Sequence, residues 1–342
     1  MAYTDIDKPS DYFTTKLYSG TGGTQSITTG FEPNFSWIKS RNDSANHNLF
    51  DVVRGATKYL KSNATNAETT DSTSLTSFNS NGFTLGSNTD QDVNKNNDTY
   101  VSWNWKAGGS ASSNSNGSIT SSVSANQDAG FSIVSYTGTG YPDSTNSATV
   151  GHGLGVAPKM VIVKNRIDAG NWTVGININS SIDFDKALML NLTSAIEDYN
   201  GYFNDTNPTS SVFSVGFHSN TNGGSDALIA YCFSDVQGFS KIGSYIGNGS
   251  TDGTFVYTGF KPAWVVAKKT SGTGSWRMWD NKREGYNGDN AFLYANLSNA
   301  EESDGTLVDF CSQGFKWRGS SQDMNGSGGT YIYMAFAENP FV

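Results

Sequence analysis

The sequence is poor in charge, proline and cysteine, and it has no long apolar run. Charged residues make up 15% of its 342 residues, below the usual level of about 25%. No apolar run approaches the length of about eighteen residues needed to cross a membrane, and the opening MAYTDIDKPSDYF lacks the apolar segment of a secretion signal. We therefore expect neither membrane insertion nor export. Cys232 and Cys311 are expected to be free thiols, packed as small hydrophobic residues.

Basic residues are too few for a nucleic-acid partner, and histidines are too scattered for a metal centre. Twenty-two Lys and Arg against 31 Asp and Glu give a net charge of −9, which repels a phosphate backbone. None of His47, His152 and His218 stands beside another ligand at metal-site spacing. The stretch NTDQDVNKNNDTY at 88–100 lacks the glycine and the final glutamate of a calcium loop, so we interpret it as a solvated turn. We predict no cofactor and no metal site.

Small polar residues and aromatic residues are abundant instead. The sequence has 38 glycines, many Ser, Thr and Asn, and 13% aromatic residues spread along its length. This mixture favours short strands joined by polar turns, with enough aromatic area to form a core. A chain of 342 residues exceeds one ordinary core and fits two or three domains of roughly 100–150 residues.

One motif recurs three times in order. It reads GFEPNFSWIKSR at 30–41, GVAPKMVIVKNR at 155–166 and GFKPAWVVAKKT at 259–270. Each copy places a lysine six residues after a proline: Pro33 and Lys39, Pro158 and Lys164, Pro262 and Lys268. The run between them is apolar on both parities, as in a strand that is buried on both faces. Three ordered copies indicate an internal repeat.

Other features recur at matching places in each copy. A Tyr-x-Gly opening at 18–20, 136–138 and 245–247 predicts a first strand, and Asn63, Asn191 and Asn296 predict a turn or a short helical start. Each copy closes on an alternating strand, YVSWNW at 100–105, LIAYCF at 228–233 and YIYMAF at 331–336. One parity of these strands should face the core: Val101, Trp103, Trp105, Ile229, Tyr231, Phe233, Ile332, Met334 and Phe336.

We predict an all-β fold of three tandem β-sandwich repeats, jelly-roll or concanavalin-like, of about 100 residues each. The predicted boundaries are 1–108, 126–235 and 236–342, with helix restricted to a turn or two near Asn63, Asn191 and Asn296. The Gly/Ser/Asn-rich stretch at 109–125 is predicted to be a flexible or extended linker. We therefore expect units two and three to pack closely and unit one to be more loosely tethered.

Units one and three share an Asp-x-x-Arg feature that unit two lacks. Asp51 with Arg54, and Asp280 with Arg283, are predicted to be structural ion pairs that brace a loop. The alternative is a sugar-binding or hydrolytic groove. Glu68 and Glu301 follow in the same two units, where unit two has Ile196, and each could complete the carboxyl pair of a glycosidase.

Aromatic residues in the middle of the units form the best candidate binding surface. Trp172, Trp276, Trp279 and Tyr286, with Arg283, stand where sandwich loops would project and could stack on sugars. Core packing is the alternative for each ring.

The segment before the first unit is a candidate docking peptide. DKPSDYF combines a proline-stiffened stretch with Tyr12 and Phe13, which could anchor it on the sheet edge of a neighbouring protein. The alternative is that Tyr12 and Phe13 cover the apolar end of unit one. Neither coiled-coil heptads nor collagen repeats mark a homotrimer, although that state suits a fibre.

Several motifs together resemble a family of virion-associated proteins of marine tailed phages, an uncharacterised repeat domain of tail-fibre and other structural proteins. They are MAYTDIDKPSDYF, GFEPNFSWIKSR, DVVRGATKYL, YVSWNWKAGG, GFSKIGSYIGNGSTDGTFVYTGFKPAWVV and GGTYIYMAFAENPFV. The resemblance implies a structural or host-attachment role in the virion, after assembly in the bacterial cytoplasm, with other virion proteins or a host surface polysaccharide as partners. It brings no catalytic residues. A polysaccharide depolymerase and a free lectin-like module are the alternatives.

Overall fold

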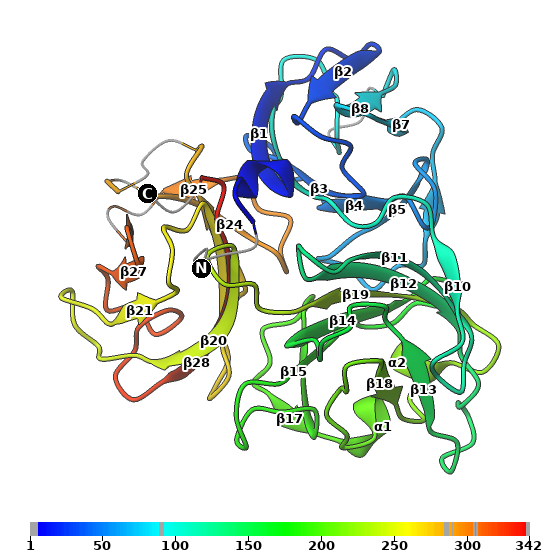
Figure 1. Ribbon diagram of the computed structural model, residues 1–342. Helices are drawn as coiled ribbons and strands as arrows, with labels where there is room; N and C mark the ends of the chain where they lie inside the picture. Colours follow the sequence, from blue (N-terminus) through cyan, green and yellow to red (C-terminus); the bar gives the residue numbers. More distant parts are fainter. Residues whose placement is uncertain are drawn as a thin grey trace.

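The computed structural model describes residues 6–88, 92–283, 287–288, 290–303, 305 and 307–339. The protein is all-β, with 42% strand and 3% helix, as the composition predicted. The strands form three β-sandwich-like lobes that are grouped around a common centre (Figure 1). We call them lobe one (strands β1–β9), lobe two (β10–β19) and lobe three (β20–β28).

Lobe one contains a six-stranded antiparallel sheet, in the order β1-β9-β3-β4-β5-β6, and a three-stranded sheet, β2-β8-β7. Its strands are β1 (Phe13–Ser19), β2 (Gln25–Thr28), β3 (Phe35–Ser40), β4 (Asn48–Asp51), β5 (Lys58–Leu60), β6 (Thr69–Thr70), β7 (Leu75–Asn79), β8 (Gly82–Leu85) and β9 (Thr99–Trp105). A short 3-10 helix, η1 (Pro9–Asp11), precedes β1.

Lobe three repeats this connectivity, with sheets β20-β28-β22-β23-β24-β25 and β21-β27-β26. Its strands are β20 (Ser240–Ile246), β21 (Phe255–Tyr257), β22 (Trp264–Lys269), β23 (Arg277–Asp280), β24 (Ala291–Tyr294), β25 (Glu302–Ser303), β26 (Val308–Cys311), β27 (Gly314–Trp317) and β28 (Thr330–Phe336). In both lobes the closing strand lies between the opening strand and the strand of the proline–lysine motif.

Lobe two has the same inner order but two extra strands at its edge, in an eight-stranded sheet β10-β11-β12-β19-β14-β15-β16-β17 beside a two-stranded sheet β13-β18. Its elements are β10 (Ser112–Asn114), β11 (Ser121–Asn126), β12 (Phe131–Thr137), β13 (Ala148–Gly151), β14 (Met160–Asn165), β15 (Thr173–Ile176), β16 (Lys186–Met189), β17 (Glu197–Asp198), α1 (Asn200–Phe203), β18 (Val212–Val215), α2 (Ser219–Asn222) and β19 (Ala227–Phe233). The prediction of a linker at 109–125 is therefore wrong. This stretch forms β10 and most of β11, which pair with β12 and each other through backbone bonds that do not require apolar side chains.

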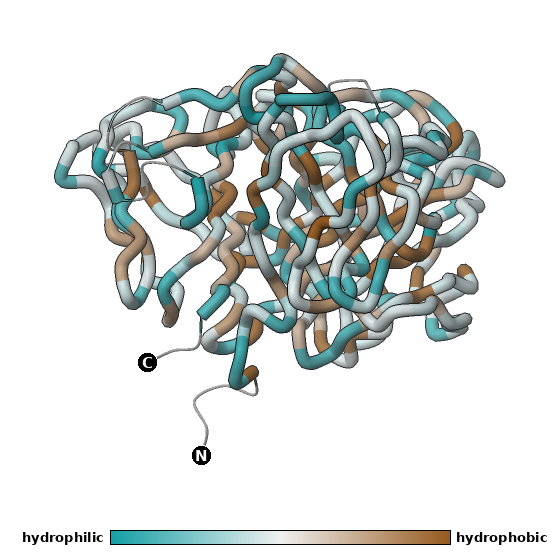
Figure 2. Tube along the Cα trace, turned by 90° about the horizontal axis from the view of Figure 1, so that it is seen from above, coloured by the Kyte–Doolittle hydropathy of each residue, from teal (hydrophilic) through white to brown (hydrophobic). Residues whose placement is uncertain are grey.

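Each large sheet is apolar on both faces, as the proline–lysine motif predicted. One face packs against the small sheet of the same lobe, for example Phe50, Phe83 and Tyr100 in lobe one. The other face joins one aromatic-rich core that is shared by all three lobes. In Figure 2 the brown, hydrophobic segments run mainly through the interior.

The shared core contains the whole predicted inward parity of the closing strands. Trp103 and Trp105 of lobe one, Phe233 of lobe two, and Trp264 and Phe336 of lobe three all belong to it. The ring centroids of Trp105 and Trp264 are 5.5 Å apart, and those of Phe233 and Phe336 are 6.1 Å apart. The expectation that lobe one is loosely tethered is therefore wrong, because its second apolar face is buried against both neighbours.

Helix is scarce but lies away from the predicted places. Within the described residues the helical segments are η1, α1 and α2, whereas Asn63, Asn191 and Asn296 stand in turns. The side-chain oxygen of each Asn accepts a backbone N–H bond within its own lobe, from His47, Trp172 and Trp276 respectively. These amides therefore tie a turn to a neighbouring strand. No helix in the described ranges has the length and apolar content to span a bilayer.

Candidate functional site at the lobe junctions

A buried carboxylate network joins lobe one to lobe two. The side-chain oxygen Oδ2 of Asp51 lies 2.5 Å from Nε of Arg54 and accepts the hydroxyl of Tyr231, from lobe two, at 2.7 Å. Both side chains of the Asp–Arg pair are fully buried. The other oxygen of Asp51 accepts the backbone N–H groups of Val53 and Arg54, which fixes the turn after β4. The predicted ion pair is present, and it reaches a second lobe.

The network continues through a bidentate clamp. The carboxylate of Glu68 accepts two bonds from the Arg166 guanidinium, at 2.9 and 3.0 Å, and lies 3.3 Å from Nη1 of Arg54. The backbone N–H of Glu68 also donates to the carbonyl of Arg166 at 2.9 Å. Such a fork-to-fork pair is strong and directional. It locks the turn after β5 to the end of β14.

The junction between lobes three and one has the same parts in the same geometry. Asp280 lies 2.7 Å from Nε of Arg283 and accepts the indole N–H of Trp103, from lobe one, at 3.0 Å. Glu301 accepts two bonds from Arg41 at 2.9 and 2.8 Å, and its N–H donates to the Arg41 carbonyl. The second predicted ion pair is thus also present, and it also bridges two lobes.

Among the described residues, the junction between lobes two and three has no carboxylate–guanidinium network. Strand register places Ile176 of lobe two at the position of Asp51, and Met334 of lobe three at the position of Tyr231. Both are buried in the shared core. Further out, the N–H of Ile196 donates to the carbonyl of Thr270 at 3.1 Å, the same backbone bond that Glu68 makes to Arg166. Isoleucine and threonine therefore stand where the other junctions have glutamate and arginine.

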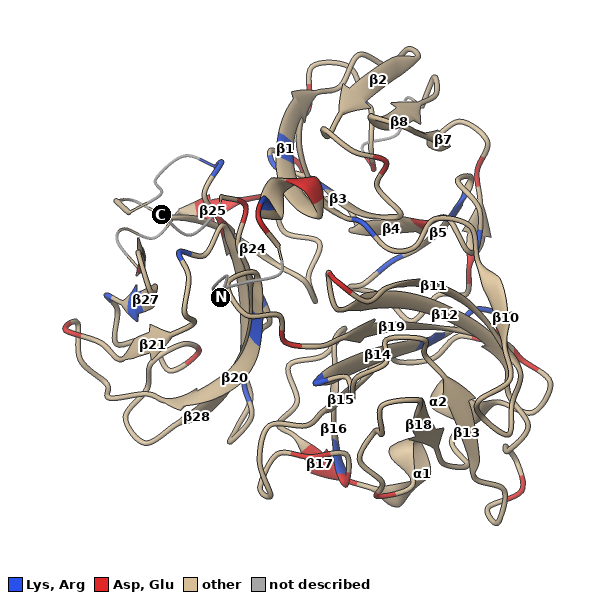
Figure 3. Ribbon diagram, in the orientation of Figure 1, with Lys and Arg blue, Asp and Glu red and all other residues tan. Residues whose placement is uncertain are grey.

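The carboxylate of Glu68 has a pKa below its ordinary value. Burial would raise the pKa of Glu68, but the hydrogen bonds and charges of Arg166 and Arg54 outweigh it and lower the pKa. A general acid of a glycosidase needs the opposite shift. Figure 3 shows the charged residues in short scattered segments rather than one continuous patch.

Two of the predicted sugar-stacking tryptophans lie at the junctions instead. Trp172 and Trp276 are buried in the shared core. The indole N–H of Trp172 donates to the carbonyl of Lys61 in lobe one at 2.8 Å, and that of Trp276 donates to Met189 in lobe two at 2.9 Å. Each ring thus joins its lobe to the preceding one.

Trp279 and Arg283, which were also predicted to contact sugars, are not on a surface. Trp279 is 2% exposed and packs against Trp317 and Phe292 inside lobe three. Arg283 is 2% exposed and is held in its ion pair. Tyr286 lies outside the described residues. The prediction of an exposed sugar platform is wrong for the described residues, because each large sheet needs apolar cover on both faces and these side chains supply it.

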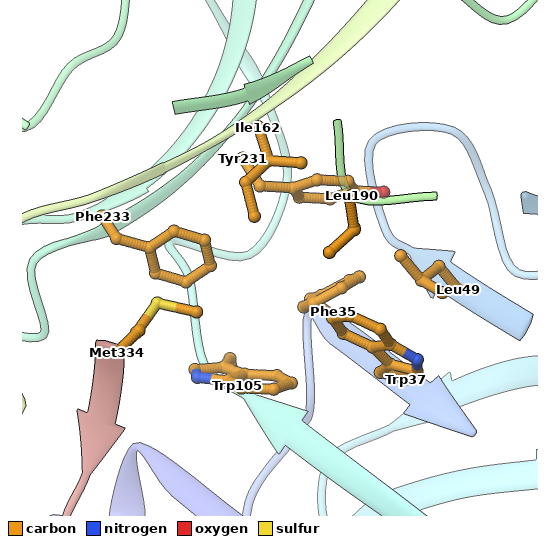
Figure 4. A pocket seen from close by; sticks show the side chains of 9 residues that line it. All are labelled: Phe35, Trp37, Leu49, Trp105, Ile162, Leu190, Tyr231, Phe233 and Met334. Carbon is orange, nitrogen blue, oxygen red and sulfur yellow. The ribbon is translucent and has the colours of Figure 1, made fainter. Parts of the chain in front are cut away.

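A small cavity lies in the shared core (Figure 4). Its volume is about 10 Å³, and side chains from all three lobes line it, among them Trp105, Tyr231, Phe233 and Met334. The cavity is close to the minimum for one water molecule, and its lining is apolar. It is a packing gap where three sheets meet and is too small for an organic ligand.

The lysines of the repeated motif are buried beside the core. Nζ of Lys39, Lys164 and Lys268 donates to the carbonyl of the residue that follows it, at 2.6, 2.7 and 2.6 Å. Nζ of Lys268 also reaches the carbonyls of Thr193 and Ser194 in lobe two. Burial lowers the pKa of each lysine to about 8. Each ammonium group therefore binds the carbonyl of the last residue of its motif strand.

The histidines and the oxygen-rich stretch have structural contacts. His47 accepts the indole N–H of Trp37, while the rings of His152 and His218 accept backbone N–H groups in lobe two. Burial lowers the pKa of all three imidazoles. Within 88–100, Asn94 binds backbone groups of the neighbouring loops; residues 89–91 lie outside the described part. The described residues contain no group of three or more potential metal ligands of the His, Cys, Asp or Glu type.

The candidate docking residues belong to the core. Phe13 is fully buried and its ring lies 5.3 Å from that of Phe336 and 5.0 Å from that of Trp105. Tyr12 packs edge-on against Phe239, with Nζ of Lys106 over its ring. The docking prediction is therefore wrong for Phe13, and the alternative of covering an apolar end describes both residues. Both cysteines are free thiols, as expected; Cys232 is buried and Cys311 is half-buried.

Sequence reasoning missed that the acidic features join lobes. The signal was present in the last letter of the repeated motif, which reads Arg41, Arg166 and Thr270. Arg41 binds Glu301 and Arg166 binds Glu68, whereas Thr270 contacts Ile196.

A model of one protein family matches residues 8–340 of the chain, and its description is Domain of unknown function (DUF7483). No curated protein matches the chain.

Proposed function

We propose that this chain, which belongs to the DUF7483 family, is a structural component of a phage particle. It would serve as a tail-fibre or surface-decoration module, made in the bacterial cytoplasm, that assembles with other virion proteins and attaches to a host surface glycan. The motifs quoted above suggest the particle. The single observation that carries a structural role is the joining of three lobes into one body by a shared aromatic core and two buried ion networks.

The proposal includes the finer architecture, three tandem β-sandwich repeats. Its support is the common strand order of lobes one and three and the shared inner order of lobe two. Further support comes from equivalent contacts, such as the backbone bond from Glu68 to Arg166, from Ile196 to Thr270 and from Glu301 to Arg41. Lobe two differs by the edge strands β10 and β11.

A rigid scaffold is favoured over a depolymerase by the state of the acidic residues. Asp280 and Glu301 both contact Arg283, and Glu301 also binds Arg41. Two guanidinium groups neutralise and position these carboxylates. The contacts from Arg41 and Trp103 to these carboxylates also fix the orientation of lobe one on lobe three, as a rigid structural component requires.

Mass spectrometry of purified particles tests the proposal. We expect the chain in stoichiometric amounts in virions of the phage that encodes it, and its absence from washed particles would refute the role. Release of reducing sugar from host envelope polysaccharide would favour the enzyme instead if it disappeared in Glu301→Gln but persisted in Glu32→Gln, an exposed glutamate of lobe one. Mass photometry of the purified protein tests the homotrimer.

A further inference from the structure

A groove of about 620 Å³ opens between lobes two and three. Lobe two contributes the turn at Asn179–Ile182 and Ile196, and lobe three contributes the end of β20 with Thr270, Ser271 and Thr330. This volume is within the range of about 300–1,000 Å³ that is typical of small-molecule sites. The groove is therefore large enough for a short oligosaccharide.

The groove exists because this junction lacks the ion network. Thr270 occupies the position of Arg166, since the N–H of each donates to the carbonyl of the first residue of its closing strand, Thr330 or Ala227. Ile196 occupies the position of Glu68, and strand register places Asn179 at the position of Arg54. At the other junctions these places hold the long side chains of the clamp. Here shorter side chains leave the space open.

The lining is neutral and rich in hydrogen-bonding groups. The residues that line the groove are serines, threonines, asparagine, isoleucines and tyrosine, and no charged side chain is among them. The side-chain oxygen of Asn179 accepts two backbone N–H groups, and its amide N–H groups donate to none of the described residues. The hydroxyl groups of Ser181 and Ser244 likewise make no hydrogen bond to the described residues. These groups are available to a ligand.

Apolar surface completes the groove. Ile246 is 65% exposed at the end of β20, and Ile196 is half-buried opposite it on lobe two. Sugars combine hydroxyl groups with apolar ring faces, so they need both kinds of lining. A neutral lining gives no compensation for an anionic ligand, and the net charge of −9 opposes one.

We propose that this groove binds a neutral oligosaccharide, with Asn179, Ser181 and Ser244 as polar contacts and Ile246 as the apolar one. The inference rests on the host-attachment part of the proposed function and names the class of ligand for it. The two can fail separately, because sugar binding is measured on the purified protein and the structural role is measured on particles.

Ligand-observed NMR on the purified full chain tests the inference. The probes are neutral maltotriose, cellotriose, mannotriose and N-acetylated chitotriose, with trigalacturonate as the acidic comparison. We expect saturation transfer to at least one neutral sugar and a weaker signal for trigalacturonate. Asn179→Ala and Ser244→Ala should each weaken the affinity about two- to tenfold, as expected for one lost hydrogen bond.

Two variants close the groove in different ways. Ile196→Glu with Thr270→Arg rebuilds the clamp, and Ser271→Trp places a large ring on the exposed rim; both should abolish the signal. The matched controls are Ser26→Glu with Thr84→Arg, a cross-strand pair in lobe one, and Ser80→Trp in a hairpin turn. Controls should keep the wild-type signal.

Three results would overturn the inference. They are no binding of any neutral sugar, binding that survives Ser271→Trp, and binding of trigalacturonate alone. β20 is also the outer strand of its sheet, whereas β11 covers the corresponding edge of β12. Saturation transfer to the peptide SSVSAN, which copies β11, with none to any neutral sugar would assign the site to an extended peptide and reject the glycan.

Discussion

The junctions on either side of lobe one and the junction between lobes two and three meet the same need with different chemistry. Around lobe one, buried Asp–Arg pairs bind an aromatic partner from the next lobe and continue into Glu–Arg clamps. Between lobes two and three, Ile176 and Met334 occupy the same inner places and belong to the same core. All the partners of the network change together, so no buried carboxylate or guanidinium loses its counter-ion.

The difference shows that fixing the relative orientation of two lobes and stabilising their junction are separate effects. A buried ion network loses much of its Coulomb energy to desolvation, and replacing a whole network by apolar residues is often neutral or stabilising by about 1–4 kcal/mol. Removing one partner is costly. The apolar junction therefore need not be the weaker one. The junction between lobes two and three lacks the outer Glu–Arg clamp, and the groove is present for that reason.

Breaking one network should have the largest effect. Arg54→Met leaves the fully buried carboxylate of Asp51 without its cation, and we expect about 3–5 kcal/mol of destabilisation. Guanidinium denaturation followed by tryptophan fluorescence measures it. Asn179→Met changes the equivalent position of lobe two and should cost at most about 1 kcal/mol. Equal losses in the two variants would contradict the comparison.

Replacing the whole network sharpens the test. The combined substitutions Asp51→Ile, Arg54→Asn, Glu68→Ile, Arg166→Thr and Tyr231→Met copy the apolar junction onto lobes one and two. We expect this variant to recover most of the stability lost in Arg54→Met, because no unpaired charge remains. A variant less stable than Arg54→Met would show that the two solutions are not interchangeable.

The clamp should also give one junction a dependence on acid. The lowered pKa of Glu68 means that its ionised form stabilises the fold above the unfolded value near 4.3, and that this stability is lost as the pH falls through the folded pKa. We expect Glu68→Gln to lower the free energy of unfolding at pH 7 by about 1–3 kcal/mol. Thermal unfolding measures this as a lower melting temperature. The difference from wild type should shrink as the pH falls below the unfolded value and through the lowered folded pKa. Glu32→Gln, at an exposed site, should show no such convergence.

Both kinds of junction contain a tryptophan whose indole N–H binds a carbonyl of the preceding lobe. Removing this hydrogen bond should destabilise the protein equally at each junction, and by less than the changes above. Trp172→Phe removes the indole bond to Lys61 at a clamped junction, and Trp276→Phe removes the bond to Met189 at the apolar one. Each should cost about 1–2 kcal/mol, because one buried carbonyl loses its donor. Thermal unfolding measures both. A loss confined to Trp172→Phe would mean that this contact depends on the clamp.

The smallest effect is expected from grafting the clamp. Ile196→Glu with Thr270→Arg adds one partly exposed ion pair between lobes two and three, for which about 0–1 kcal/mol of stabilisation is usual. A double-mutant cycle in low and high salt isolates the pair, and high salt should reduce the coupling. Coupling that does not respond to salt would indicate a rearranged groove.

The central strands could be predicted because the pattern of apolar residues within each strand indicates which faces are buried. WVVAK and MVIVK are apolar on both parities, and they became central strands with both faces covered. The inward parity of YVSWNW and YIYMAF was also correct. What covers the second face could not be predicted. A row of lobes and a closed group of three need the same strands, and the distinction lies in contacts such as Phe13 with Phe336 across more than 300 residues.

The candidate site was predicted less well than the fold. Asp51, Arg54, Asp280 and Arg283 were correctly expected to form structural ion pairs, since a short Asp-x-x-Arg spacing closes a turn locally. Their partners Tyr231 and Trp103 come from another lobe, and no local pattern indicates them. Trp172 and Trp276 lie in segments that differ between the three repeats, where exposed aromatic residues would also be expected. The interlobe carbonyls that hold them are invisible in the sequence.

The shared core also has a consequence for synthesis on the ribosome. The aromatic face of lobe one is complete once β9 has been made, but its cover includes Trp264 and Phe336 of lobe three. Translation of residues 109–342 at roughly 5–20 residues per second takes on the order of ten to fifty seconds. During that interval the nascent chain presents Phe13, Phe35 and Trp105 to solvent. Its yield should therefore depend on chaperone holding and on the local rate of translation, well before any question of final stability arises.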